Sequence, residues 1–405
     1  MRQALNAAKL FLVDRQLAAD LGVTGYVASW IRRHGWEPTF LFRNVTIGGE
    51  KRRSVLPVVM NLFTERALLT RLALPDTSDA AGRLARRLES PESGTLVTGP
   101  LLASVECALT DLPVLRHQPR EAGPYLTSFV AALRDPDNGT VNLGYYRALV
   151  DGPYRLVLFL DQRTDGWSIV ERCRQRGEET PISLFNGGHP ATSLAAAAAL
   201  PPGLDSHGAA ARLSGETLTL ADFGDGHPPV PADAEIVILG RITADNGREA
   251  PFGEFKGYYA APTSSPVVRV ETVLRRPDAH YLGLFCGKES GLTLMKLQNE
   301  ILMSAALARQ GFPVGRVRFP LDAFGEFSVL IESERPNPAL LEAAMAANRR
   351  AKLFIVARNL EQAHRTLSIF SFHARTEPYT KRGKQEGQRI GILAEDDRHH
   401  DWVEY

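Results

Sequence analysis

The chain has 405 residues, of which 44% are hydrophobic and 23% charged; 47 basic and 46 acidic side chains give a formal net charge of +1. This length is too great for one hydrophobic core, so we expect two or three domains. The balanced charge argues against nucleic-acid or membrane-surface binding, and three scattered cysteines without C-x-x-C spacing argue against disulfides and zinc. Without a long apolar run or a signal-peptide layout, a cytoplasmic protein is expected.

The first part of the chain is predicted to be a small α/β portion. Residues 1–35 have an amphipathic pattern and are predicted to form a helix. "TFLFRNV" (39–45) and "SVLPVVMNL" (54–62) are short apolar runs typical of buried strands, and residues 64–75 and 79–90 are predicted helices.

The middle of the chain is richer in predicted strands. Strand-like runs flank the turn cluster "DPDNGT" (135–140), and "PISLF", "AEIVILGRIT" and "PVVRVETVLRR" are further apolar strands. Helices are predicted at 167–179 and in the Ala-rich stretch 191–200, which ends at "PPG". This density of strands indicates a β-barrel or a sandwich-like domain.

In the last part of the chain, predicted helices alternate again with predicted strands. Helices are predicted at 292–311 and 338–350, and strands at 314–320, 327–333 and 351–358. The tail from residue 379 is polar, so we expect it to contribute little to a core.

The stretch "EAPFGE" places two acids, Glu249 and Glu254, close together around a proline and a glycine. Pro251 and Gly253 interrupt regular structure, which lets the two carboxyl groups point at different atoms of one cavity. For an isolated arginine and two glutamates, a structural ion-pair cluster is the commoner outcome.

Several motifs occur together and in a fixed order. They are "FLFRNV" with "LPVVMNLFTERALLTRLAL", "LPVLRHQPREAGPYLTSFVAALRDPDNGTVNLGYYR", "VPADAEIVILG" and "EAPFGEFKGYY". With them the chain resembles the UbiD family of reversible decarboxylases, which use prenylated FMN. The resemblance implies an α+β fold in which a central split β-barrel, flavin-reductase-like, is flanked by smaller α/β portions. It predicts an N-terminal α/β portion (1–110), a cofactor-binding barrel (111–285) and a C-terminal α/β oligomerisation domain (286–405).

The same resemblance implies a catalytic network of Arg147, Glu249 and Glu254 over the flavin. A planar guanidinium binds a carboxylate at two points, which suits Arg147 to the substrate. An anion beside it, Glu249, would fix the orientation of the guanidinium. A carboxyl group kept away from water can hold a proton, which suits Glu254 to proton transfer.

The family holds the cofactor phosphate through a divalent metal such as Mn²⁺ and through K⁺, with Asn, His and Glu as ligands. Asn142 matches the first of these. Gln162 stands where the His is expected, and Ser206 falls where the Glu is expected, with Asp205 and His207 as neighbouring alternatives. Glutamine and serine are poor ligands, so metal binding is left open.

The implied function is non-oxidative decarboxylation or carboxylation of an α,β-unsaturated or aromatic carboxylic acid, with prenylated FMN as cofactor and Lys256 facing its phosphate. The expected partners are the small-molecule acid, a flavin prenyltransferase that supplies the cofactor, and further copies of the chain in a homodimer or larger homo-oligomer. The alternative is a protein of the same fold with a metal-free cofactor site that does different chemistry or has lost catalysis.

Overall fold

The computed structural model describes most of the chain. The described residues are 1–8, 10–48, 52–64, 69, 72, 74, 79–201, 204–359, 372–381 and 384–394. Contacts between Cα atoms divide the chain into two compact units, one made of Met1–Pro75 and Ser90–Leu294, the other of Asp76–Glu89 and Met295–Tyr405. The three domains predicted from the sequence, with boundaries near residues 110 and 285, remain a prediction.

The first unit begins with a short helix and a small mixed sheet. Helix α1 covers Arg2–Ala7 and helix α2 covers Gly22–His34. The sheet has the order β1-β3-β6-β21, with strands Leu10–Val13, Thr39–Phe42, Val58–Met60 and Tyr281–Gly283. A smaller sheet joins β2 (Leu17–Ala18), β4 (Val45–Ile47) and β5 (Arg52–Arg53).

The prediction of one helix over residues 1–35 is therefore wrong. The run "LFLV" pairs in parallel with β3 along its whole length, from Leu10 opposite Thr39 to Val13 opposite Phe42. That pairing joins segments distant in the sequence and overrides the local helical pattern. The predicted strands at 39–45 and 54–62 are confirmed by β3, β4 and β6, whereas the helix predicted at 64–75 lies largely outside the described residues.

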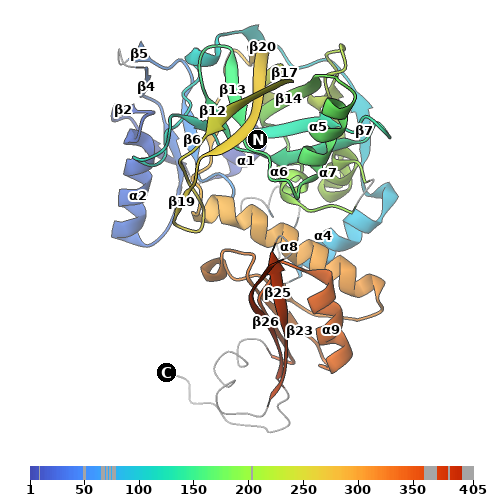
Figure 1. The fold of residues 1–405 in the computed structure, drawn as a ribbon. Helices are drawn as coiled ribbons and strands as arrows, with labels where there is room; N and C mark the ends of the chain where they lie inside the picture. Colours follow the sequence, from blue (N-terminus) through green and yellow to red (C-terminus); the bar gives the residue numbers. More distant parts are fainter. Residues whose placement is uncertain are drawn as a thin grey trace. The chain divides into compact units, whose positions relative to one another are not determined.

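A nine-stranded sheet forms the centre of the first unit. Its order is β11-β10-β14-β17-β20-β13-β12-β9, and β8 pairs with β20. The strands are β8 (Val105–Glu106), β9 (Tyr125–Leu126), β10 (Val130–Arg134), β11 (Val141–Tyr145), β12 (Ala148–Val150), β13 (Arg155–Leu158), β14 (Thr180–Gly187), β17 (Ala234–Glu249) and β20 (Thr263–Arg275). The long strands β17 and β20 curl across the unit (Figure 1). The predicted turn at 135–140 is confirmed, since Asp135 N–H donates to the Thr140 carbonyl at 2.8 Å.

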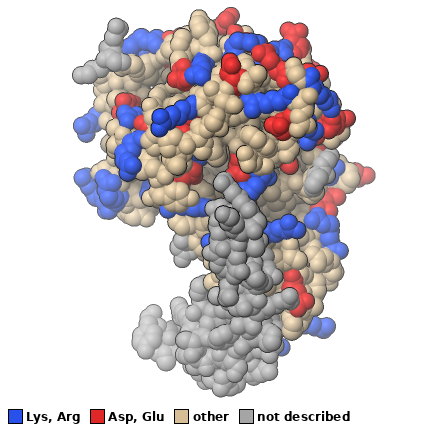
Figure 2. Space-filling model, viewed as in Figure 1, with Lys and Arg blue, Asp and Glu red and all other residues tan. Residues whose placement is uncertain are grey.

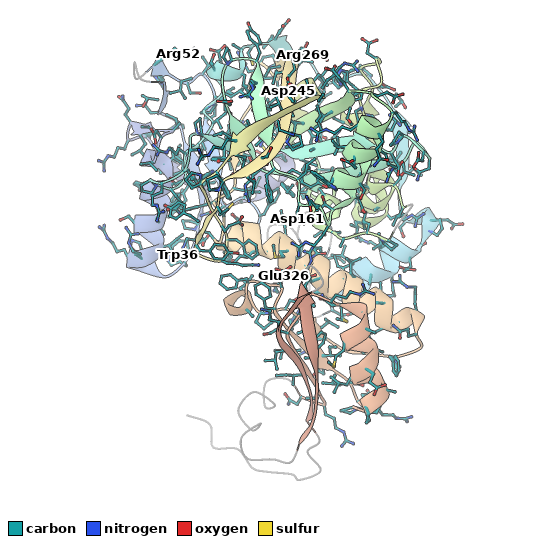
Figure 3. All side chains as sticks on the ribbon, in the orientation of Figure 1. Trp36, Arg52, Asp161, Asp245, Arg269 and Glu326 are labelled. Atoms are coloured by element: carbon teal, nitrogen blue, oxygen red, sulfur yellow. The ribbon has the colours of Figure 1, made fainter. Side chains whose placement is uncertain are left out.

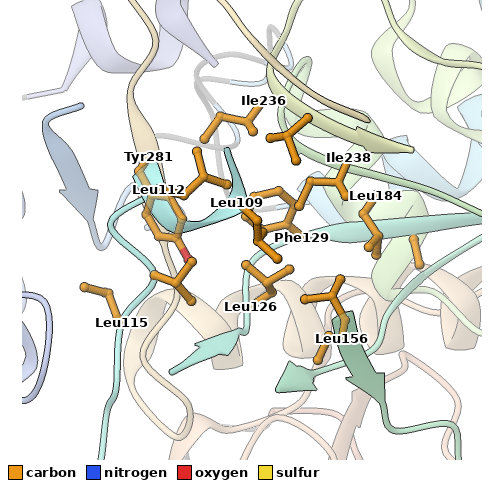
Figure 4. Close-up of a cluster of buried hydrophobic side chains, with 14 of the residues drawn as sticks. Leu109, Leu112, Leu115, Leu126, Phe129, Leu156, Leu184, Ile236, Ile238 and Tyr281 are labelled. Carbon is orange, nitrogen blue, oxygen red and sulfur yellow. The ribbon is translucent and has the colours of Figure 1, made fainter. Parts of the chain in front are cut away.

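The inner face of this sheet encloses the main hydrophobic core. Leu126, Phe129, Leu156, Leu184 and Ile238 converge there from five strands or their ends (Figure 4). Their neighbours along β14 and β17, Phe185, Val237 and Leu239, belong to a second buried cluster, whereas Asp245 and Arg269 on β17 and β20 are exposed (Figure 3). Burial of this apolar surface is the main stabilising contribution to the barrel.

Three helices and a small sheet pack against the nine-stranded sheet. The helices are α5 (Asp165–Gln175), α6 (Pro190–Ala197) and α7 (Ser206–Ser214), and they lie on one side of the barrel strands (Figure 1). The sheet joins β16 (Val230–Pro231), β15 (Thr217–Ala221) and β7 (Thr95–Thr98). Helices α5 and α6 confirm predictions, whereas α7 was not predicted.

The second unit contains helices and a five-stranded sheet. The helices are α4 (Ala80–Glu89), α9 (Pro338–Ala347) and most of α8 (Glu289–Arg309). The sheet has the order β22-β23-β24-β26-β25, with strands Val317–Arg318, Ser328–Glu332, Leu353–Ala357, Lys384–Ala394 and Phe372–Lys381. The tail from residue 379 was expected to add little to a core, and this remains a prediction; its described part forms β26, which pairs in parallel with β24.

The described elements together confirm the predicted α+β class and the curled, barrel-like central sheet. No helix in the described part of the chain has the length and apolar composition that crossing a bilayer requires. On the face shown in Figure 2, basic and acidic side chains are interspersed.

Candidate active site

Arg147 lies between β11 and β12, and its side chain meets both acids of the "EAPFGE" stretch. Its Nε donates to Glu249 Oε1 at 2.8 Å and its Nη2 donates to Glu249 Oε2 at 3.1 Å. Its Nη1 donates to Glu254 Oε1 at 2.6 Å. The structure thus brings an arginine together with two acids that lie more than a hundred positions away in the chain.

Aromatic rings enclose the guanidinium. The Arg147 Cζ atom lies 3.9 Å from the ring centroid of Phe159 and 4.6 Å from that of Phe252. Burial lowers the pKa of Arg147, but the hydrogen bonds and charges of the two glutamates outweigh this and the pKa stays raised. The arginine is therefore a permanent cation in a partly desolvated site.

The two glutamates differ in exposure. The Glu249 side chain is 0% exposed, whereas that of Glu254 is 22% exposed. Glu249 is the last residue of β17, where it pairs with Thr263 of β20. Glu254 follows the short strand β18 (Phe252–Gly253), in a turn that leads to β19 (Tyr259–Ala260). Glu254 is thus the acid that a ligand can reach, and Glu249 is the one that holds the arginine.

Tyr125 supports the loop between these acids. It is fully buried, accepts a hydrogen bond from Ala250 N–H at 3.2 Å and donates to the Pro251 carbonyl at 3.5 Å. Burial raises the pKa of its phenol, so it stays protonated and can donate. This residue was not predicted as part of the site, although one of the motifs that carry the resemblance contains it.

Cys286 also lies near the cluster. It packs against Tyr125 and Phe252, and burial raises the pKa of its thiol to about 12, with further contributions from Glu121 and Glu254. A thiol that stays protonated is a poor nucleophile, so Cys286 acts here as a small hydrophobic side chain.

Asn142 lies on β11, and Ser206 is the first residue of α7, whose N-terminus contacts that strand. The Asn142 Oδ1 accepts a hydrogen bond from Tyr146 Oη at 3.2 Å. The Ser206 Oγ, which is buried, accepts from Leu143 N–H at 3.1 Å. The neighbouring Asp205 accepts from Val141 N–H at 2.8 Å through Oδ2 and caps α7 through Oδ1.

Gln162 and Lys256 occupy exposed turns. Gln162 lies in the turn that Asp161 opens between β13 and α5 (Asp161 is labelled in Figure 3). Lys256 lies in the turn between β18 and β19, with its Nζ 5.2 Å from the ring centroid of Phe255. Their predicted contacts with a cofactor remain a prediction.

The donor atoms near Asn142 do not fit a divalent metal ion. Within the described part of the chain, no group of three or more His, Cys, Asp and Glu residues is placed to hold one. Both Asp205 oxygens and Ser206 Oγ already accept backbone hydrogen bonds. His207 Nε2 bonds to the Pro229 carbonyl, and burial lowers the pKa of its imidazole. We therefore assign no chemical step to a metal.

The curled central sheet and the α/β elements around it have a UbiD-like architecture. Residues 97–289 match the family model described as the UbiD 3-octaprenyl-4-hydroxybenzoate carboxy-lyase Rift-related domain. The matched residues cover the central domain, so this part of the chain is similar to the UbiD family.

Solved structures with the same fold cover nearly the whole chain. An evolved dimeric form of the UbiD-class enzyme HmfF from Pelotomaculum thermopropionicum, in complex with prFMN, has a TM-score of 0.85 and 24% identity, covering 99% of this chain and 96% of that one. The 3,4-dihydroxybenzoic acid decarboxylase AroY of Klebsiella pneumoniae has a TM-score of 0.80 and 18% identity, covering 99% and 97%. At these identities, the likeness shows the fold.

Sequence relatives match a shorter region. Anhydromevalonate phosphate decarboxylase of Methanothermobacter thermautotrophicus is 30% identical over 241 residues, which is 59% of this chain and 56% of that protein. An uncharacterised protein of Aeropyrum pernix is 32% identical over 194 residues, covering 47% and 40%. The chain thus spans about half the length of the curated relatives it matches.

Proposed function

We propose that this chain is a carboxy-lyase of the UbiD type, acting with prenylated FMN on an α,β-unsaturated or aromatic carboxylic acid. The observation that carries the proposal is the set of three hydrogen bonds by which Arg147 engages Glu249 and Glu254 inside a matched UbiD domain. The decarboxylase activity named for the Methanothermobacter relative supports the same class of reaction.

Arg147 is the carboxylate-binding group in this proposal. A guanidinium carries five N–H groups, and three of those in Arg147 donate to the glutamates. Two remain for a substrate carboxylate. Glu249 holds the guanidinium through two parallel bonds, which fixes the plane in which the substrate is gripped. Such a charge-assisted bond contributes roughly 1.5–3 kcal/mol.

Glu254 is the proton-transfer group. With both glutamates ionised, the cluster of Arg147, Glu249 and Glu254 has a formal charge of −1. A bound substrate carboxylate would make this charge −2 in a partly desolvated site. Protonation of the reachable acid, Glu254, relieves that repulsion. The proton is then in place to be delivered to the carbon that loses CO₂, and the resulting carboxylate can act as base in the reverse direction.

The donor set fits a site completed by prenylated FMN. An arginine and two carboxyl groups can bind, orient and move a proton, but they cannot take up the electron pair left on an sp² carbon. When bound, the cofactor supplies that electron acceptor. We assign Asn142, Gln162, Ser206 and Lys256 as its candidate contacts, with a flavin prenyltransferase as its source. We also propose that the enzyme is cytoplasmic and homo-oligomeric; the dimeric form named for HmfF supports the second of these proposals.

Replacement of Glu254 tests this function. The chain would be co-expressed with a flavin prenyltransferase, and the purified protein examined for near-UV and visible absorption. Glu254→Gln should lower turnover at least about 10²-fold and stop solvent deuterium entering the product, while the cofactor absorption persists. Unchanged turnover would remove Glu254 from the mechanism; a colourless, inactive wild-type protein would favour the alternative of altered or lost catalysis.

A further inference from the structure

The carboxylate of Glu121 is buried beside the proposed active site and accepts hydrogen bonds from three main-chain N–H groups. The residue is 3% exposed. Its Oε2 accepts from His117 N–H at 2.7 Å and from Gln118 N–H at 3.0 Å. Its Oε1 accepts from Gly253 N–H at 3.3 Å. Because Gly253 precedes Glu254 directly, this carboxylate fixes the backbone from which the proposed proton donor projects.

The segment 117–122 lies directly against the segment 251–259. A Cβ atom added at Gly253 would lie 2.7 Å from Gln118 Cγ and 3.3 Å from Glu121 Oε1, so only glycine fits without displacement. Ala122 N–H donates to the Pro251 carbonyl at 3.1 Å. Arg120 N–H donates to Tyr259 Oη at 3.4 Å, and its guanidinium lies 4.6 Å from that ring's centroid.

Hydrogen bonding separates Glu121 from proton transfer. Burial raises the pKa of Glu121, and the backbone N–H groups of Gln118, His117 and Gly253 oppose that rise. Its oxygens are occupied by these donors, which leaves it as an acceptor in a fixed position. A misplacement of about 1 Å in a reacting group can cost on the order of 10²-fold in rate.

We propose that Glu121 is a positioning residue for Glu254. By holding Gly253 it sets where the Glu254 carboxyl lies relative to Arg147, at the 2.6 Å contact between Oε1 and Nη1. The proposal deepens the function given above and rests on it. It predicts that the geometry of the proton donor can be damaged from a residue that touches neither substrate nor cofactor.

Glu121→Gln tests the positioning role. A carboxamide has one acceptor oxygen and one NH₂ donor group. It therefore cannot accept from the N–H groups of His117 and Gln118 and also from that of Gly253. We expect kcat to fall about 10- to 100-fold, KM to change less than about threefold, and solvent deuterium incorporation to fall with kcat. Glu37→Gln is a matched control, because Glu37 is another partly buried acid that accepts a backbone N–H, from Glu289 at 2.9 Å; it should leave kcat within about twofold.

A rescue experiment separates positioning from loss of fold. Gly253→Ala should lower kcat as much as Glu121→Gln does, because its Cβ meets Gln118 Cγ. Adding Gln118→Ala removes that Cγ but keeps the main-chain donor, so the double variant should regain at least about threefold in kcat. A kcat within about twofold of wild type for a folded Glu121→Gln variant, or no recovery in the double variant, would overturn the proposal.

Amide hydrogen exchange provides a readout that does not depend on turnover. In Glu121→Gln, the peptide containing 250–257 should exchange faster than in wild type and in Glu37→Gln, because the Gly253 amide loses its acceptor. An inactive wild type would refute the proposed decarboxylase function. Faster exchange in the variant would then still support the contact between Glu121 and the Gly253 amide. Unchanged exchange would refute the positioning role even in an active enzyme.

Discussion

Two polar regions of the first unit are built in opposite ways. Around Arg147, charged side chains bind one another, and unused N–H groups remain on the guanidinium. At the contact of α7 with β11, Asp205 and Ser206 bind backbone amides of Val141 and Leu143 instead. The first arrangement leaves N–H groups for a ligand carboxylate, whereas in the second the side chains of Asp205 and Ser206 support the scaffold. Buried polar residues therefore do not all mark a substrate-binding site, and their hydrogen-bond partners distinguish the two kinds of region.

Removing Glu249 should have the largest effect on stability. Glu249→Ala leaves Arg147 Nε and one Nη2 hydrogen without acceptors in a buried position, which should lower the unfolding free energy by about 3–5 kcal/mol. Urea denaturation measures this. The control is Glu179→Ala, which breaks the exposed pair with Arg269 and should cost below about 1 kcal/mol. Equal losses in the two variants would mean that the Arg147 cluster is no more than a surface ion pair.

Acid should destabilise the region beside the active site through His117. Burial lowers the pKa of this histidine to about 4, against an ordinary value of 6.5. Between these two pH values His117 binds a proton in the unfolded chain but not in the folded chain. The contribution of His117 to the unfolding free energy is therefore complete above pH 6.5. It is lost as the pH falls toward 4, by about 3 kcal/mol.

Unfolding curves at several pH values check this expectation. His117→Gln should flatten the stability profile between pH 6.5 and 4. The remaining slope should include His207, whose imidazole pKa burial also lowers. A variant with the same slope as wild type would show that His117 titrates normally.

Asp205→Ala should weaken the α7–β11 contact by about 2 kcal/mol, the sum expected for a lost helix cap and a lost backbone hydrogen bond. Asp205→Asn should cost less, since its carbonyl oxygen can still cap α7. Thermal or urea unfolding measures both. A loss below about 0.5 kcal/mol for Asp205→Ala would show that these bonds do not hold the helix.

Metal should have the smallest effect. Because the oxygens of Asp205 and Ser206 are occupied, titration of the purified protein with Mn²⁺ should reveal no saturable site, and EDTA should leave bound flavin unchanged. Calorimetry and absorption measure the two quantities. Stoichiometric Mn²⁺ binding that Asn142→Ala abolishes would contradict the distinction between the two regions.

The sequence is sufficient to predict the residues of the Arg147 cluster but not their support. Arg147, Glu249 and Glu254 occur in ordered motifs that resemble those of the UbiD family, and that resemblance implies their proximity. Glu121 could not be assigned, because its partner Gly253 is brought to it only by the folded barrel. Helix α7 does carry local signals that could have predicted it: Asp205 at its N-cap, an Ala-rich interior and Gly215 with φ of 70° at its end.

The prediction for the first strand is wrong for a different reason. β1 gains its hydrogen bonds from β3, a strand separated from it by helix α2, and local periodicity does not report such pairing. The irregular backbone between Glu249 and Glu254 was easier to predict, because Pro251 and Gly253 exclude a long helix or strand there in any fold.

Strand β11 ends one side of the nine-stranded sheet, and such an outer strand can recruit strands from other molecules. Here the amides of Val141 and Leu143, which would template that addition, are covered by Asp205 and Ser206. We therefore expect this pair to protect the edge from strand addition and aggregation, and a redesign of these positions for metal binding would have to preserve that protection.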